Sequence, residues 1–429
     1  MIKTVIISIA LLSFFSAFSQ PLGYSYGKQI LVDGTKVSGT VDLVDFTMLV
    51  SMTDLDLRSV SNGGHVESEN GYDILFTDAD CGITILVHQI ENYDPITGNF
   101  IAWVKVNKLN ATANTNIHMY YGNSSVTTDP SSSLAWHSDV GAVYHLSNND
   151  FTDGTSNAMN ATNISTGVVT GQIGEGRSFN GSSQYLNVSE SGTTSLDATT
   201  LTMSAWIYPT NYNVVSDRGI LINKESRYEM GLRDNVGSIQ AASSPGCWRW
   251  AGTEVIPLNT WSKVTVVYGG GSQKHYVNGV WIENFNDCSN PLATNDSDLR
   301  IGARGGDGSP GSYFRGNIDE VKIVGREEST DWIATEYTNQ NDPSTFYTKS
   351  IEMTASNLCF TLPIELSKFV AKKDNDNVIL EWVTLSEIDN DYFEIERSSD
   401  YFNWKVINKV NGAGNSISEI NYKEIDYSP

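Results

Sequence analysis

Short runs that alternate apolar and polar residues recur along almost the whole chain, and they constrain its fold more than any other feature. Examples are IAWVKV (101–106), LTMSAWIYP (201–209), SKVTVVY (262–268) and NVILEWV (377–383), separated by clusters of Gly, Asn, Asp and Ser. β-Branched and aromatic residues at period two favour strands with one buried face. The single modest helix candidate is 329–340. The sequence therefore predicts an all-β protein of sandwiches or jelly rolls.

The length of the chain and its polar stretches predict several domains. A chain of 429 residues exceeds what a single hydrophobic core organises, so two to four domains are expected. The stretch VTTDPSSS (126–133) has the composition of a linker, and a softer boundary lies at 341–350. We therefore expect domains at 24–130, 140–340 and 362–429.

The first residues have the features of a signal peptide, predicted at 1–19. A basic residue precedes the apolar run VIISIALLSFF (5–15), which is too short to cross a bilayer. Small residues at Ala17 and Ser19 suit a cleavage site, which would leave Gln20 as the mature start. We therefore expect a secreted or cell-surface protein with no transmembrane anchor.

The charge of the chain limits its partners. The formal net charge is -23, from 27 basic and 50 acidic side chains. Nucleic acids and anionic membranes need a basic surface, so neither is expected. A strongly anionic polysaccharide is disfavoured unless a divalent ion bridges it to the protein. The oligomeric state stays open.

Four cysteines are too few for a disulfide scaffold and lack the spacing of a zinc site. Cys247 and Cys288 fall within one expected domain, whereas Cys81 and Cys359 lie in separate regions. Export permits a disulfide, and we predict one between Cys247 and Cys288. Closing a loop of that length contributes about 3–4 kcal/mol in the chain-entropy model. Cys81 and Cys359 are expected to stay free.

Residues 24–130 resemble a family of small exported bacterial domains of unknown function, which are expected as a β-sandwich. The matching words are FTMLVSMTDLDL (46–57), GYDILFTDAD (71–80), HQIENYDPITGNFIAWVKV (88–106) and IHMYYGN (117–123). The family implies no chemistry. His88, Glu91 and Asp94 could form a ligand or acid–base set, but polar residues beside a turn more often serve the structure.

Residues 140–326 resemble a laminin-G-like jelly roll of the concanavalin A-like superfamily. The matching words include GAVYHLSN (141–148), GQIGEGRSFNGSSQYLNV (171–188), LNTWSKVTVVY (258–268) and FRGNIDEVKIV (314–324). From Leu362 on, the chain resembles a fibronectin-like β-module of proteins exported by type IX secretion, with Trp382 to Ser398 as the most similar part. The sequence stops before the final strands of that module, which is expected to be incomplete.

One segment imitates a catalytic motif. Glu387, Asp389 and Asp391 alternate, as do the acids on the catalytic strand of laminarinase-like jelly rolls. Alternate residues lie roughly 6.5–7 Å apart on one face of a strand, a spacing that suits paired carboxyl groups. The segment SEIDND is rich in turn-forming residues and lies outside the jelly roll, so we predict an acidic turn. Beyond it, Phe393 and Ile395 should face the core.

The jelly roll itself shows no catalytic pair. Glu225 and Glu229 occur without the motif, and neither a Ser-His-Asp arrangement nor His-Glu-x-x-His is present. We therefore expect a binding domain more than an enzyme.

A calcium site is expected at the rim of the jelly roll, as the laminin-G and pentraxin resemblance implies. Asp319 alternates with Val321 and Ile323, which places it on their core-facing side, whereas Glu320 and Lys322 should face the other way. A carboxylate on a core face needs a partner or a metal. The expected ligands are hard oxygen donors, namely Asp153, Asn157, Asn160 and Asp319. The alternative is that Asp319 and Asp153 accept backbone hydrogen bonds.

An aromatic pair suggests a sugar-binding surface. Trp248 and Trp250 lie two residues apart and share one face of a strand, and apolar faces of sugar rings pack on indoles. Tyr228 and Arg233 are expected on the same surface. A place in the core is the alternative for the tryptophans.

These features favour a non-catalytic secreted or cell-surface protein that binds carbohydrate or another extracellular ligand. Two alternatives stay open. One is a polysaccharide-degrading glycoside hydrolase, or an accessory part of one; the other is a purely structural adhesin.

Overall fold

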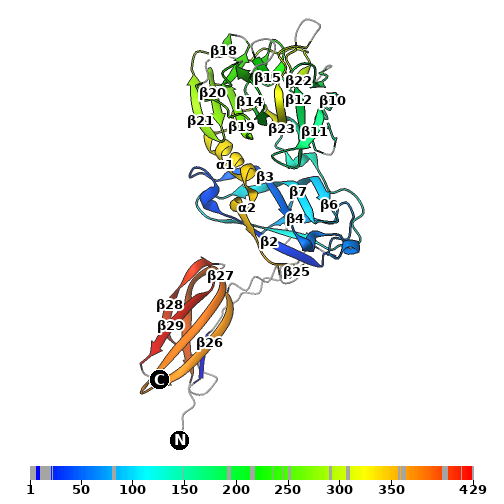
Figure 1. The fold of residues 1–429 in the computed structure, drawn as a ribbon. Coiled ribbons are helices and arrows are strands. Elements are labelled where there is room, and N and C mark those ends of the chain that lie inside the picture. Colours follow the sequence, from blue (N-terminus) through cyan, green and yellow to red (C-terminus); the bar gives the residue numbers. More distant parts are fainter. Residues whose placement is uncertain are drawn as a thin grey trace. The chain divides into compact units, whose positions relative to one another are not determined.

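The chain divides into two units in the computed structural model, Pro21–Met353 and Thr354–Pro429 with Met1–Gln20 (Figure 1). The structure describes residues 6–9, 21 and 23–427, apart from gaps at 80–83, 148, 191–194, 213–217, 234, 245, 250–252, 289–291, 306–309, 356–357, 359–363, 399–403 and 417. Strands dominate both units, so the prediction of an all-β protein is confirmed. Cys81, Cys359 and Trp250 lie outside the described residues.

The first domain is a sandwich of two sheets. One has the order β3-β7-β6 and the other the order β24-β2-β8-β4-β5, with β25 also pairing with β2. Their inward-facing residues, including Phe46, Val104 and Met119, form one core. The strands are β2 (Tyr26–Val32), β3 (Leu43–Thr53), β4 (Leu75–Asp78), β5 (Ile85–Leu86), β6 (His88–Asp94), β7 (Asn99–Leu109), β8 (Thr115–Tyr121), β24 (Tyr347–Lys349) and β25 (Met353–Thr354).

The expected linker at 126–133 packs against this sandwich. The backbone N–H of Ser132 donates to the carbonyl of His88 at 2.9 Å, and the N–H of Ile90 donates to the hydroxyl of Ser131 at 3.0 Å. The chain therefore enters the second domain along the edge of β6.

The second domain consists of two larger sheets. The strand order is β10-β13-β22-β15-β16-β17-β18 in one and β11-β12-β23-β14-β19-β20-β21 in the other, with β9 also paired with β23. Apolar residues between the sheets form the largest core of the chain. The first sheet is built from β10 (Ala161–Ile164), β13 (Tyr185–Val188), β15 (Arg218–Lys224), β16 (Tyr228–Arg233), β17 (Ile239–Ser243), β18 (Cys247–Arg249) and β22 (Leu299–Ile301). The second is built from β9 (Val140–Tyr144), β11 (Gly167–Thr170), β12 (Glu175–Asn180), β14 (Leu201–Pro209), β19 (Ser262–Gly269), β20 (Ser272–Val277), β21 (Val280–Phe285) and β23 (Arg315–Val324).

The predicted helix is present as α1 (Thr330–Asn341), and the hydroxyl of Ser329 caps it by accepting from the N–H of Trp332. After α1 the chain returns to the first domain. α2 (Pro343–Phe346) leads into β24, which pairs with β2, and Phe346 lies in the core of the first domain. The chain thus leaves the second domain within the region 341–350, where a soft boundary was expected, and these residues complete the first sandwich.

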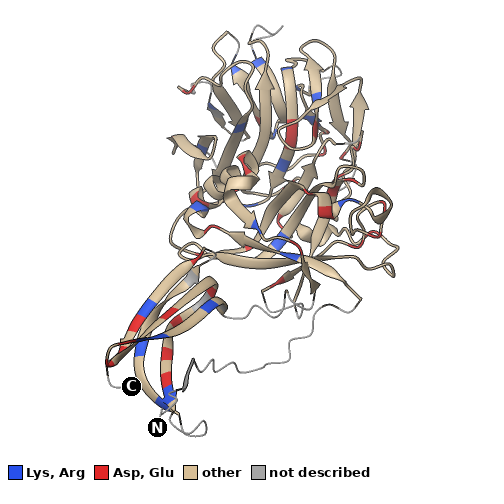
Figure 2. Ribbon diagram, turned by 60° about the horizontal axis from the view of Figure 1, so that its bottom comes forward, with Lys and Arg blue, Asp and Glu red and all other residues tan. Residues whose placement is uncertain are grey.

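The second unit is a five-stranded sheet around Trp382, Phe393 and Ile395. Its strands are β26 (Ile364–Asp374), β27 (Asn377–Ser398), β28 (Lys405–Ser416), β29 (Ile420–Asp426) and β1 (Ile6–Ile9), which lies in the predicted signal peptide. Both acidic and basic residues lie along these strands (Figure 2). The core placement of Phe393 and Ile395 is confirmed.

The predicted acidic turn at 386–391 is not present. β27 runs without interruption through these residues, and its pairing with β28 shifts register between Glu387 and Tyr392. Such irregularities bend a strand without ending it. Glu387 is fully buried and accepts hydrogen bonds from the side chains of Thr384, Asn390 and Tyr422 and from the N–H of Ala413. Its role is structural.

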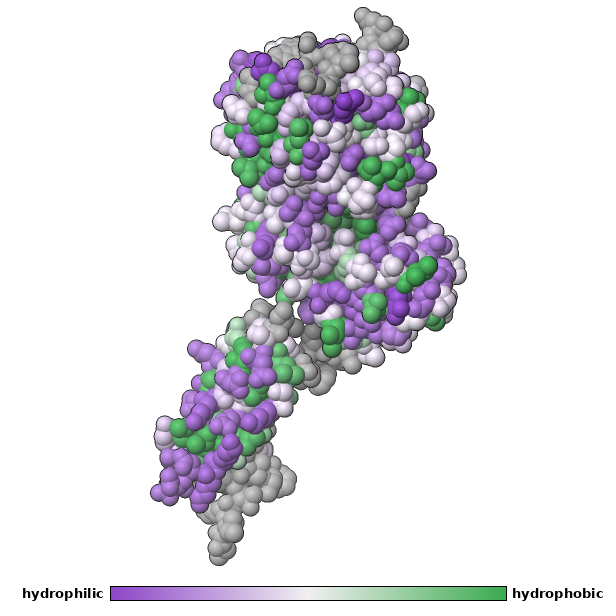
Figure 3. Space-filling model, viewed as in Figure 1, coloured by the Kyte–Doolittle hydropathy of each residue, from purple (hydrophilic) through white to green (hydrophobic). Residues whose placement is uncertain are grey.

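The visible surface of the molecule is mainly polar. Hydrophobic residues lie scattered in small groups on the face shown in Figure 3. Among the described residues, no helix combines the length and the apolar character needed to cross a membrane.

Candidate functional site

A row of directly opposed residues crosses the seven-stranded sheet of the second domain on the face turned away from the core. Their neighbours on each strand, such as Leu186, Ile301, Ile222 and Met230, belong to the core between the sheets. Successive side chains of a strand point to opposite faces, so the row faces outward. In spatial order the row is Asn187, Arg300, Asn223, Glu229 and Ala242.

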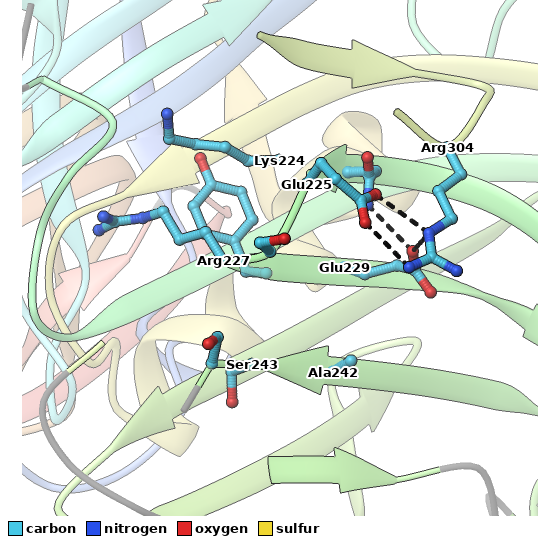
Figure 4. Close-up of a pocket in the computed structure, with 11 residues that line it drawn as sticks. Lys224, Glu225, Arg227, Glu229, Ala242, Ser243 and Arg304 are labelled. Carbon is cyan, nitrogen blue, oxygen red and sulfur yellow. Dashed lines mark hydrogen bonds and ion pairs between the residues drawn. The ribbon is translucent and has the colours of Figure 1, made fainter. Parts of the chain in front are cut away.

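A pocket opens on this face at the hairpin between β15 and β16 (Figure 4). Arg304 donates from Nε and one terminal nitrogen to the two carboxylate oxygens of Glu225, at 3.0 and 2.9 Å. Glu229 accepts from Arg218 at 3.0 Å and from the Asn223 amide at 3.0 Å, and it lies 3.5 Å from Nε of Arg304. Two carboxylates and two guanidinium groups are thus joined in one network.

The opposite side of the hairpin is anchored to the rim loops by buried cations. Lys224 donates to the carboxylate of Glu190 and to the carbonyls of Asn295 and Ser297, the latter two at 2.7 and 2.8 Å. Arg227 is paired with Asp197. Burial and the nearby charge of Arg227 lower the pKa of Lys224 to about 8. These contacts hold the hairpin that carries Glu225 and Glu229.

The pocket offers both hydrogen-bond donors and acceptors in fixed positions. Burial raises the pKa of Glu229, although the charges of Arg218 and Arg304 oppose that shift. The hydrogen bond to Glu225 raises the pKa of Arg304. Side chains of Glu225 and Arg304 remain 24% and 30% exposed, so a ligand can reach them. The arrangement suits a small polar ligand with several hydroxyl groups.

The predicted sugar-binding residues do not form one surface. Tyr228 lies in the core, and Arg233 is exposed at the end of the same strand, β16. Five positions separate the two residues, an odd number, so their side chains lie on opposite faces. The expectation that they share a surface is therefore wrong. The backbone of Trp248 lies in β18, opposite Ala242 and in register with the polar row.

The predicted calcium ligands are already used within the protein. The carboxylate of Asp153 accepts from the N–H groups of Val143, Thr155 and Met159 and from the Thr155 hydroxyl. Asn157 donates to the carbonyl of Gly141, and the amide oxygen of Asn160 accepts from the N–H of Asp153. The carboxylate therefore organises a loop, and the calcium site stays a prediction.

Asp319 faces the core, as expected, and is fully buried. One of its oxygens accepts from the N–H of Ile173 at 2.9 Å. Burial, followed by the charge of Glu320, raises its pKa well above the usual range. Glu320 and Lys322 were expected to face away from the core, yet both are buried, at 5% and 8% exposure, because the first domain and α1 cover that face of β23.

His88, Glu91 and Asp94, which were considered as an acid–base set, have three different environments. Asp94 closes a turn by accepting from the N–H of Ile96 and the hydroxyl of Thr97. His88 is buried near Phe76, and burial lowers its pKa to about 4. Glu91 instead meets His145 and Glu320 of the second domain.

The predicted disulfide between Cys247 and Cys288 is confirmed. It joins β18 of the polar face to the segment that follows β21, across the core between the sheets.

Sequence reasoning missed Asn223, Arg304, His145 and Glu320. The acids Glu225 and Glu229 were visible in the sequence, but their partner Arg304 lies about eighty positions further on. The available signal was the alternation of polar and apolar residues along 218–233. This alternation predicts a polar outward face, but it does not show which side chains from other segments lie on that face.

Comparisons with known proteins find matches for two parts of the chain. Residues 180–334 match the model of the concanavalin A-like lectin/glucanases superfamily, and residues 70–160 match a domain of unknown function. The chain therefore contains a concanavalin A-like domain, preceded by a domain of an uncharacterised family. Comparison with curated proteins gives no match. The likeness of the last module to type IX-secreted proteins stays a prediction.

Similar solved structures are remote. Domain 4 of the arabinanase AbnA from Geobacillus stearothermophilus, solved with arabinotriose, is 19% identical over 48% of this chain and 98% of that chain, with a TM-score of 0.38. Trypanosoma rangeli sialidase, solved with 2,3-difluorosialic acid, is 15% identical over 48% of this chain and 34% of that chain, with a TM-score of 0.38. A pentraxin from Limulus polyphemus is 14% identical over 32% and 69%, with a TM-score of 0.26. At this level the likenesses carry no argument about function.

Proposed function

We propose that this chain is an exported binding protein whose concanavalin A-like domain binds carbohydrate at the hairpin pocket and does not cleave it. The observation that carries the proposal is the polar row across an outer sheet face, with the Arg304–Glu225–Glu229 network beside it. Export rests on the signal-peptide features of residues 1–19.

A sugar ring presents several hydroxyl groups, each of which both donates and accepts a hydrogen bond. Asn223, Glu229 and Arg304 supply acceptors and donors from three neighbouring segments, and their mutual hydrogen bonds hold them in place before a ligand arrives. A site organised in advance loses less conformational entropy on binding. The strongly acidic chain favours a neutral glycan over an anionic one.

Binding without cleavage is favoured by the state of the two carboxylates that line the pocket. A glycosidase needs one carboxyl group that donates a proton and a second that acts as nucleophile or base. Glu225 is held by two hydrogen bonds from Arg304, and Glu229 is held by Arg218. The two hydrogen bonds from Arg304 occupy both carboxylate oxygens of Glu225, which opposes a role for Glu225 as the nucleophile or base.

The test is a glycan array followed by calorimetric titration of the neutral oligosaccharides that bind. We expect Arg304→Gln to weaken binding by about ten- to a hundredfold, because it removes charge-assisted hydrogen bonds worth about 1.5–3 kcal/mol. The matched control is Arg315→Gln in β23 of the other sheet, where the exposed side chain contacts the carbonyl of Asn180. Equal weakening in both variants would contradict the proposed pocket.

Two other outcomes would select the alternatives. Release of new reducing ends from a bound polysaccharide, lost in Glu229→Gln, would show a glycoside hydrolase. An empty glycan array with retained adhesion to cells would show a structural adhesin.

A further inference from the structure

Three metal-ligating side chains from the two domains of the first unit meet at the contact between these domains. Glu91 comes from β6 of the first domain, His145 follows β9 of the second domain, and Glu320 lies in β23. Nδ1 of His145 is 3.0 Å from each carboxylate oxygen of Glu320 and 3.5 Å from Oε2 of Glu91. The side chain of His145 is 13% exposed, that of Glu320 is 5% exposed and that of Glu91 is 1% exposed, so the group is almost enclosed.

Gln89 determines which nitrogen of His145 carries hydrogen. The amide oxygen of Gln89 accepts from Nε1 of Trp136 at 2.8 Å, and its amide nitrogen donates to the carbonyl of Gly154 at 3.1 Å. This oxygen, 3.3 Å from Nε2 of His145, can only accept, so Nε2 carries a hydrogen. In the neutral ring, the Nδ1 lone pair therefore faces the carboxylates, and a proton or a cation must lie between them.

Buried acids outnumber buried lysines at this contact. Lys322 lies 2.6 Å from Glu336 and 3.2 Å from Glu328, and Lys263 lies 3.6 Å from Glu336. Burial and the neighbouring charge of Glu91 raise the pKa of Glu320 well above its usual range. Excess negative charge in a buried place is costly unless protons or a cation neutralise it. Across the described residues, this contact holds two buried lysines and four buried carboxyl groups, Glu91, Glu320, Glu328 and Glu336, and the buried Asp319 lies near Glu320 and Glu91.

Irregular backbone brings the two glutamates together. The pairing of β6 with β7 shifts between Ile90 and Asn92, at Glu91. The pairing of β23 with β14 shifts opposite Ala205, and Glu320 there has a φ of 49°. A bulge redirects side chains that regular pairing would send elsewhere, so the cluster depends on two bulges, one in each domain.

We propose that Glu91, His145 and Glu320 bind a divalent transition-metal ion such as Zn²⁺, which would link the two domains. In a tetrahedral site with bonds of about 2.0–2.1 Å, ligand atoms lie about 3.3 Å apart. The observed spacings of 3.0 to 3.5 Å fit that geometry. The histidine favours zinc-like ions over calcium, which prefers oxygen ligands alone.

The surroundings of these ligands match the hydrogen bonding typical of metal sites. Nε1 of Trp103 donates to Oε2 of Glu91 at 2.8 Å, and the hydroxyl of Ser147 donates to Oε1 at 2.6 Å. Gln89 orients His145 from the far side of the ring. Such second contacts align ligands and commonly change metal affinity 10–100-fold when they are lost.

A second group, Asp56, His65 and Glu352, is a weaker candidate. Lys28 already lies 2.6 Å from Asp56, and its ammonium group neutralises that carboxylate. Among the described contacts, His65 has a single carboxylate partner, Glu352, at 2.7 Å. This group therefore supplies a comparison within the same protein.

The test is calorimetric titration of the full-length, chelator-treated protein with ZnCl₂ near neutral pH. We expect one tightly bound zinc ion per chain, and at least a tenfold loss of affinity in Glu91→Gln and in His145→Gln. Two controls should leave binding unchanged. His65→Gln alters the second group, and His275→Gln alters a buried histidine that lies 2.9 Å from the single carboxylate of Glu283.

Absence of zinc binding by the wild-type protein, or unchanged affinity in both Glu91→Gln and His145→Gln, would overturn the proposal. Visible absorption of the wild-type protein with CoCl₂ gives a second measurement that does not depend on the folding of any variant. Intense bands of tetrahedral Co²⁺ are expected, and a spectrum equal to that of Co²⁺ in buffer would also overturn the site.

Discussion

Two buried glutamates in different units of this chain have opposite environments. Glu387 in β27 is fully buried, accepts four hydrogen bonds from neighbouring groups and has a lowered pKa, because these donors outweigh the effect of burial. Glu320 in β23 is nearly as buried, but it faces His145 and a second carboxylate, and its pKa is raised. Burial alone therefore does not decide the charge of a carboxyl group; the groups around it do.

The contrast also separates a structural carboxylate from a candidate ligand. The donors around Glu387 satisfy its charge completely within one module. At Glu320 the protein places acids from two domains together and supplies too few cations. The segment that looks most like a catalytic motif is thus structural, whereas the proposed metal site has no motif.

Removing the carboxylate of Glu387 should give the largest effect. We expect Glu387→Ala to lower the free energy of unfolding of the second unit by about 3 kcal/mol, because Asn390, Tyr422 and the N–H of Ala413 lose a buried acceptor. Chemical denaturation followed by circular dichroism measures this. Glu394→Ala on the same strand removes only an ion pair with the exposed Lys409 and should cost far less. Equal losses would erase the contrast.

Zinc should stabilise the first unit by slightly less than the stability that Glu387→Ala removes from the second unit. A ligand at a hundred times its dissociation constant raises the free energy of unfolding by about 2.7 kcal/mol when only the folded state binds it. Thermal unfolding of the full chain with ZnCl₂ or with a chelator measures the difference. The transition of the second unit should not move, and a shift of that transition alone would contradict the assignment of the site.

The pH dependence should have opposite signs for the two glutamates. A carboxyl group with a raised pKa binds more protons in the folded than in the unfolded state. Its contribution is therefore present below the ordinary value of 4.5 and lost as the pH rises. We compare the free energy of unfolding of Glu320→Gln with that of the wild type, both in the presence of a chelator. The variant should gain stability relative to the wild type as the pH rises above 4.5, by at most about 1.4 kcal/mol per pH unit.

For Glu387, the sign is reversed. The contribution of a carboxyl group with a lowered pKa is present above 4.5 and lost as the pH falls through the folded-state value. Glu387→Gln should therefore differ from the wild type at neutral pH, and the two should converge in acid. Denaturation curves at a series of pH values test both signs, and equal slopes would refute the comparison.

Much of the fold could be predicted because it depends on local pattern. Alternation along 201–209 and 262–268 predicted strands that are present as β14 and β19. Ser329 and the residues after it predicted α1. The same alternation correctly placed Asp319 with the core residues Val321 and Ile323. It failed at 386–391, where pairing with β28 and β26 overrides the turn preference of Asn and Asp.

The sequence by itself determined the strands, the order of the domains and the pairing of Cys247 with Cys288, because each follows from residues within one domain or one strand. Only the tertiary structure decided which side chains meet. The row from Asn187 to Ala242 depends on the register of five strands, and the meeting of Glu91 with His145 and Glu320 depends on two bulges and a contact between domains. Register and contact are set by packing between distant segments, and no local pattern records them.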